Sequence, residues 1–331
     1  MLYLTTRDKF DTYTVYHTLK NDTAPNGALF FPFRLPSISM DSLKGKTFCE
    51  CVADILNLFF SAGLTGKEVE FSVGRYPIRV QTAHQKILVA QLWRNLDGDY
   101  AKMESRLADR IRSSESKTTF ISSWVSISIR IAVLYGVFAQ LQEEAANVCV
   151  DVAVPAGDFR LMMATWYARK MGLPIGNIVC ACDHDSVVWD FLRLGELRTS
   201  NEDAANVELE RLICGTLGVN EVLRYCDIRQ KSGVFTLDSV SKKSLSEGIF
   251  AAVVSSDRLN SVISNVYRTS SCVLDPITAA AYGGLMDYRA RSGESRAALL
   301  LADQSPLDYE SAVCDAMNIT AGDLKKLLSH S

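Results

Sequence analysis

The chain has 331 residues, which is enough for one large domain or two ordinary ones, because single hydrophobic cores stop growing at about 250 to 300 residues. Its 35 basic and 38 acidic residues give a formal net charge of −3. No block of like charges stands out, which argues against nucleic acid or an anionic membrane as a partner and leaves small molecules and proteins.

The nine cysteines are an odd number and are scattered through the chain. The opening residues 1–8 contain no apolar secretory segment. Unclustered cysteines without a secretory context are typical of a reduced protein, so we expect a cytoplasmic location.

Apolar spacing in the N-terminal third predicts mainly helices. The predicted elements are a helix within 41–60, a strand at 69–73, and helices at 82–93 and 98–112. The aromatic run 30–33 precedes them and is expected to fill the core, or to be a dimer contact if it is exposed. The polar, serine-rich segment 113–119 is the predicted linker.

The window 120–141 is the most apolar long stretch of the chain. It carries Arg130 together with several serines and glutamines, which makes it too polar for a membrane span of about 20 residues. We therefore expect a buried helix at about 125–142 and no membrane partner.

A strand, a tight turn and a helix follow in the centre of the chain. An apolar run begins at Val150 and breaks at Pro155, and a helix is predicted at 160–171 before a second strand at 177–182. This spacing predicts a parallel βαβ unit. Because free N–H groups and the helix dipole meet at the turn around Gly157, this turn is a candidate site for a small anionic ligand. The alternative is an ordinary corner without a ligand, since every parallel βα unit has such a turn.

The last third continues the alternation of helices and strands. The predicted elements are helices at 207–217, 219–230, 239–250, 257–268 and 276–292, then a strand at 297–301. Asp275-Pro276 and Ser305-Pro306 are typical helix starts, and Thr320 begins the last helix with a capping-box-like spacing. Strands alternating with helices predict an α/β fold class.

Landmarks along nearly the whole chain resemble the threonine synthase family, whose members are pyridoxal-phosphate (PLP) enzymes of the tryptophan-synthase-β fold (fold type II). The landmarks lie at 3–8, 26–32, Tyr76-Pro77, Gln85-Lys86, 97–100, 154–159, 171–175, 209–212, 275–280 and Ser305-Pro306. The resemblance implies a parallel sheet flanked by helices, with a reduced small lobe. Residues 1–66 and 117–331 would form the large lobe, and residues 67–116 the remnant of the small one.

The resemblance also implies losses at the catalytic positions. The family's Schiff-base lysine stands in a Phe-Lys-Asp setting, near a Thr-Ser-Gly-Asp-Thr-Gly turn, and neither motif occurs in this chain. Without that lysine, nothing holds the cofactor covalently or supplies the base for proton transfer. The expectation is therefore no catalytic residue and no cofactor.

A degenerate cofactor corner is what the resemblance leaves. Gly157, Asp158, Phe159 and Arg160 stand where the family has its phosphate loop. The segment 302–306 stands where the family has a threonine that contacts the pyridine nitrogen, and Asp303 in that segment could still pair with a protonated pyridine. Asp158 would repel a phosphate, whereas Arg160 would partly compensate while filling space.

Three functional hypotheses follow. The first is a non-catalytic threonine synthase homologue, a pseudoenzyme that binds a small ligand or a protein. The second is an active threonine synthase or related PLP-dependent lyase, which forms L-threonine from O-phosphohomoserine with a relocated lysine such as Lys86. The third is a homo-oligomeric scaffold, because loss of a lobe bares apolar surface.

A cysteine and histidine cluster gives one further possibility. Cys180, Cys182 and His184 could be imagined as zinc ligands, but structural zinc sites usually have two residues between paired cysteines. A hydrolytic site at His184 lacks a nucleophile elbow. We therefore expect two buried cysteines, a loop histidine and no metal site.

Overall fold

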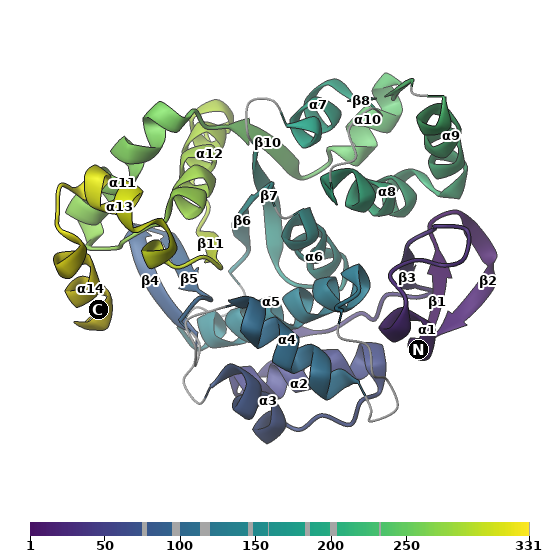
Figure 1. The fold of residues 1–331 in the computed structure, drawn as a ribbon, viewed down its shortest axis with the longest axis horizontal. Coiled ribbons are helices and arrows are strands. Elements are labelled where there is room, and N and C mark those ends of the chain that lie inside the picture. Colours follow the sequence, from purple (N-terminus) through teal and green to yellow (C-terminus); the bar gives the residue numbers. More distant parts are fainter. Residues whose placement is uncertain are drawn as a thin grey trace.

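The computed structural model describes residues 1–74, 78–94, 100–112, 120–144, 148–157, 159–182, 186–198, 204–231 and 233–330 (Figure 1). Its main sheet has the strand order β10-β7-β6-β11-β5-β4. These strands are β10 (Ile249–Val253), β7 (Ile175–Cys182), β6 (Val150–Pro155), β11 (Ala298–Ala302), β5 (Ile87–Gln91) and β4 (Arg79–His84). The pairs from β10 to β5 are parallel and β4 is antiparallel, so the predicted α/β class is confirmed.

The parallel strands define two edges of the sheet. We call the edge where β5, β6, β7, β10 and β11 end the carboxyl edge, and the opposite one the amino edge. The β6-α6-β7 crossover is the βαβ unit predicted from the sequence, and it pairs Val152 with Ile178 in register. Its helix, α6 (Phe159–Lys170), therefore begins at the carboxyl edge and ends at the amino edge.

Helices cover both faces of the sheet. On one face α6, α5 (Ser123–Glu144) and α2 (Phe48–Phe60) pack in succession, and on the other lies α12 (Pro276–Ser292), with α11 (Ser256–Ser270) beside it. Strand β11 shows why the strands are apolar throughout: Leu299 and Leu301 join one core cluster and Leu300 joins the other. This is the pattern of a parallel sheet covered on both faces.

Helix α5 is long and apolar enough to cross a membrane by length and composition, but 89% of its apolar window is buried inside the protein. The prediction of a buried helix is therefore confirmed.

A small N-terminal sheet lies beside the main body (Figure 1). Its strand order is β2-β1-β3, formed by β2 (Asp8–Thr14), β1 (Leu2–Thr5) and β3 (Phe30–Pro32). The remaining described elements are α1 (Val15–Lys20), η1 (Met40–Leu43), α3 (Gly66–Val73), α4 (Tyr100–Ile111), α7 (Val187–Leu194), β8 (Glu196–Arg198), α8 (Ala204–Leu217), α9 (Val219–Gln230), β9 (Val234–Thr236), α10 (Ser239–Leu245), η2 (Pro306–Tyr309), α13 (Glu310–Met317) and α14 (Ala321–His330).

Three sequence-based elements were wrong. The predicted strand 69–73 lies in helix α3, which begins with a capping box between Thr65 and Glu68. The predicted helix 82–93 is instead the hairpin of β4 and β5, whose turn places Gln85 at a φ of +35°. The predicted helix 239–250 ends at Leu245, and β10 follows. A short apolar run is compatible with a helix or with a buried strand. In β5 and β10, pairing and burial in the main sheet make the run a strand.

The predicted lobes stay a prediction. Strands β4 and β5 fall within the proposed small-lobe remnant 67–116, yet they extend the main sheet through β11. The predicted linker 113–119 lies outside the described residues.

Candidate functional site

Gly157 lies at the carboxyl edge, between the end of β6 and the start of α6. The residue is exposed, and a side chain built on it would meet no atom within 4 Å. The preceding amide of Ala156 is occupied, because it donates a hydrogen bond of 2.7 Å to the carbonyl of Ala181. The corner at Gly157 is thus open, while the strand before it is fixed in the sheet.

The first turn of α6 divides the predicted cofactor residues. Phe159 is buried in the core, so it anchors the helix start rather than facing a ligand. Arg160 is half-buried in the same turn. The first N–H groups of a helix have no partner within it and attract anions, and the guanidinium of Arg160 adds a positive charge. Asp158 lies outside the described residues.

Asp303 leaves the sheet next to this corner. It follows β11, which pairs with β6 through Leu300 and Ala153, and it is half-buried. Adjacent strands lie about 5 Å apart, so the structure brings Asp303 and Gly157 to neighbouring exits of the same edge. Anion-attracting groups and a carboxylate therefore lie side by side.

Lysine is missing from the segments that leave the carboxyl ends of the parallel strands. These segments are 92–99, 156–158, 183–186, 254–255 and 303–305. Lys102 follows in the first turn of α4 and is exposed. Lys86 is in the turn before β5, where its carbonyl accepts a 2.9 Å hydrogen bond from Ala298, the first residue of β11. Lys86 is therefore at the amino edge, about 16 Å from the carboxyl edge along the strand.

Two arginines near the carboxyl edge were missed by the sequence reasoning. Arg79 opens β4 opposite Gln91, and Arg94 follows β5 with its guanidinium 4.6 Å from the ring centre of Trp93. Burial and the positive charge of Arg79 together lower the pKa of Arg94. The register of the hairpin brings these arginines together, and that register was hidden by the assignment of a helix.

Cys180 and Cys182 are both buried in β7. The Cys182 thiol donates to the Cys180 carbonyl at 3.7 Å, and the thiol contact with Cys182 and burial raise the pKa of Cys180 well above its usual range. His184 lies outside the described residues, and among those that are described no group of three metal-ligating side chains comes together. The absence of a metal site stays a prediction.

Comparison with known sequences finds threonine synthases. The chain is 26% identical to Threonine synthase-like 1 of Macaca fascicularis over 145 residues, which are 40% of this chain and 20% of that protein. It is 24% identical to threonine synthase of Pseudomonas aeruginosa over 196 residues, which are 56% of this chain and 42% of that one. The chain thus spans less than half the length of these relatives. No family model matches it.

Comparison with solved structures finds the same fold. PLP-bound threonine synthase from Brucella melitensis superposes with a TM-score of 0.81 at 16% identity, covering 96% of this chain and 92% of that one. Yeast threonine synthase gives 0.80 at 15% identity, covering 99% and 94%. The chain is therefore similar in sequence to threonine synthases over part of its length and shares their fold, the type II fold of PLP enzymes, as the sequence resemblance implied.

The comparisons correct one expectation. The prediction of no cofactor for this chain is wrong, because the matched structures are threonine synthases and one of them was solved with PLP bound. The fold points to PLP.

Proposed function

We propose that this chain is a threonine synthase homologue that binds PLP or a similar small phosphorylated ligand reversibly and does not catalyse threonine formation. The observation that carries the proposal is the lack of lysine in every segment that leaves the carboxyl ends of the parallel strands. A ligand at that edge finds groups that attract its phosphate but no amine in those segments to bond with it.

The residues at the edge suit a phosphorylated ligand. Open space at Gly157, the start of α6 and the charge of Arg160 would hold the phosphate. Asp303, at the neighbouring exit, would pair with a protonated ring nitrogen. PLP bound to an enzyme supplies an electron sink for carbanion chemistry. Here Gly157, Arg160 and Asp303 would bind and orient the ligand, and no proton transfer is assigned to them.

Reversible binding is tested by equilibrium dialysis of the full chain against PLP, followed by dialysis into buffer. We expect saturable binding that is lost on dialysis, is competed by inorganic phosphate, and weakens at least about tenfold in Gly157→Asp, which places a negative charge in the open corner. The matched control is Gly322→Asp, because Gly322 is exposed in the first turn of α14, has no positive φ, and a side chain on it would meet only the Thr320 hydroxyl, at 3.7 Å. Equal affinity in wild type and Gly157→Asp would refute this site.

Loss of catalysis is tested with O-phosphohomoserine. We expect no release of inorganic phosphate above the buffer rate when PLP is in excess. Release that follows enzyme concentration would instead establish the active enzyme, the second hypothesis raised by the sequence. Lys102→Ala would then test whether Lys102 is the base, because Lys102 stands in the first turn of α4, the helix that follows β5 in the chain.

The cellular setting of this function is part of the proposal. We place the protein in the cytoplasm, which the nine cysteines support, since each is a free thiol in the structure.

A further inference from the structure

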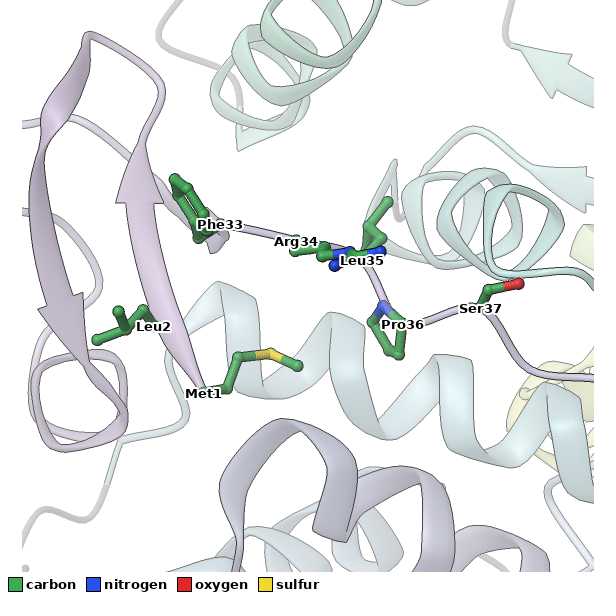
Figure 2. A pocket seen from close by; sticks show the side chains of 7 residues that line it. All are labelled: Met1, Leu2, Phe33, Arg34, Leu35, Pro36 and Ser37. Atoms are coloured by element: carbon green, nitrogen blue, oxygen red, sulfur yellow. The ribbon is translucent and has the colours of Figure 1, made fainter.

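A pocket of about 620 Å³ lies beside the N-terminal sheet (Figure 2). It is lined by Met1, Leu2, Phe33, Arg34, Leu35, Pro36 and Ser37. In Figure 2 the Met1 side chain extends toward Pro36, below the segment that joins β3 to the main body. This volume lies within the range of small-molecule sites in proteins, which is about 300 to 1,000 Å³.

The pocket is separate from the carboxyl edge. The segment that lines it continues into Ile38, whose amide donates a 2.8 Å hydrogen bond to the carbonyl of Met171, at the end of α6. Gly157 precedes the other end of this 12-residue helix. Because a helix rises 1.5 Å per residue, the two places lie about 18 Å apart. A ligand in the pocket would not touch Gly157.

The walls of the pocket expose large apolar side chains. Phe33 is 61% exposed and Leu2 is 50% exposed, and they are neighbours because the Phe33 amide donates a 3.0 Å hydrogen bond to the Leu2 carbonyl. Phe30, in the same aromatic run, is only 1% exposed. The run thus has one end in the core, as expected from the sequence, and one end in the pocket. Grouped exposed apolar side chains in a hollow mark a binding surface.

Arg34 supplies the pocket's charge. It is the one charged side chain among the lining residues, it is exposed, and it makes no ion pair with any residue that the structure describes. A guanidinium beside apolar walls complements a ligand that carries an apolar body and an anionic head.

We propose that this pocket binds a small amphipathic anion, whose apolar body contacts Leu2, Phe33 and Leu35 while its carboxylate or sulfonate pairs with Arg34. The proposal does not depend on the function proposed above, since the two sites are at opposite ends of α6.

Two probes that differ in one group test it. 1-Anilinonaphthalene-8-sulfonate has the apolar body and the anionic head, and N-phenyl-1-naphthylamine has the body alone. With the full-length chain we expect saturable 1:1 fluorescence titrations for both. Arg34→Gln should lower the affinity for the sulfonate probe by about tenfold and the affinity for the neutral probe by less than about twofold, because only the sulfonate pairs with the guanidinium.

Phe33→Ser should lower the affinity for both probes, since it removes an apolar side chain that lines the pocket. The matched control is Phe71→Ser, because Phe71 is 73% exposed on α3, outside the pocket lining. Circular dichroism checks that each variant is folded. Binding that Phe33→Ser leaves unchanged would overturn the proposal. It would also fail if Phe33→Ser dissociated an oligomer in light scattering, because the pocket would then be a contact between copies.

Discussion

The carbonyl of Lys86 accepts a hydrogen bond from the amide of Ala298 at 2.9 Å, which places Lys86 at the amino edge of the sheet. The corner at Gly157 is at the opposite edge, about 16 Å away along a five-residue strand. A lysine side chain cannot span that length, so Lys86 does not reach a ligand bound at the corner of Gly157.

A first prediction follows for Lys86→Ala. The variant should bind PLP with unchanged affinity, because the replaced side chain leaves the turn between β4 and β5 on the far side of the sheet. Equilibrium dialysis against wild type measures this. A loss of PLP binding in Lys86→Ala, with the fold intact by circular dichroism, would contradict the assignment of the edges.

A second prediction compares two glycines at the two ends of α6. Gly172 has a φ of +114°, and a side chain on it would stand 2.6 Å from the carbonyl oxygen of Ile38. Gly172→Ala should lower the free energy of unfolding by about 1–3 kcal/mol, because strain and overpacking add.

Gly157→Ala is the control, since open space surrounds that position. Gly157→Ala should change the free energy of unfolding by no more than about 0.5 kcal/mol. Urea unfolding followed by circular dichroism measures both variants, and equal destabilisation would show that the Ile38 contact is not tight.

A third prediction concerns a buried ion pair that ties the N-terminal sheet to the main body. Arg211 is fully buried, pairs with Glu208, and donates a 2.9 Å hydrogen bond to the carbonyl of Phe30. Arg211→Met leaves the Glu208 carboxylate buried without its partner, which should cost about 3–5 kcal/mol.

The matched comparison is Arg258→Met, which removes the partner of Asp287 in an exposed pair between α11 and α12. Exposed ion pairs contribute about 0–1 kcal/mol to the free energy of unfolding. The midpoint of thermal unfolding should therefore fall far more in Arg211→Met than in Arg258→Met. Similar decreases in the two variants would argue against the burial of the pair between Arg211 and Glu208.

A fourth prediction concerns pH. Asp275 caps α12 by accepting the amides of Ile277 and Thr278, and burial raises its pKa above the ordinary value. A raised pKa means that the folded state binds the proton more readily than the unfolded state. The group therefore stabilises the fold most below its ordinary pKa, and that contribution is lost as pH rises through the folded value.

Asp275→Asn keeps an oxygen acceptor and removes the charge. Relative to wild type, the asparagine variant should become more stable as pH is raised from about 4 to about 7. Asp275→Ala loses the cap and should be less stable by about 0.5–2 kcal/mol. Urea unfolding at several pH values measures the free energy of unfolding of all three proteins. If the difference between wild type and Asp275→Asn does not change with pH, the raised pKa of Asp275 is contradicted.

The sequence predicted the elements whose local signals agree with their packing. The βαβ unit around Gly157 and the proline-initiated helix after Asp275 are both confirmed. The hairpin of β4 and β5 was missed, because the apolar run 87–91 carries no strand-specific pattern and the burial in the sheet decides its structure.

The site was predictable only where it is continuous in sequence. Gly157 and Arg160 follow from one strand and helix. Asp303 was named as a cofactor residue from the family resemblance alone, and only the structure shows that β11, which precedes it, pairs with β6. The approach of Arg79 to Arg94 depends on hairpin register, and the apolar pocket at Phe33 depends on how β3 joins the main body.

The most direct test of the proposed function is intact-mass spectrometry of the full chain after incubation with one equivalent of PLP and reduction with borohydride. A threonine synthase homologue without a lysine at the carboxyl edge should keep its unmodified mass, while reversible PLP binding is still seen by dialysis. A single stoichiometric adduct, mapped to one lysine such as Lys102, would contradict the account.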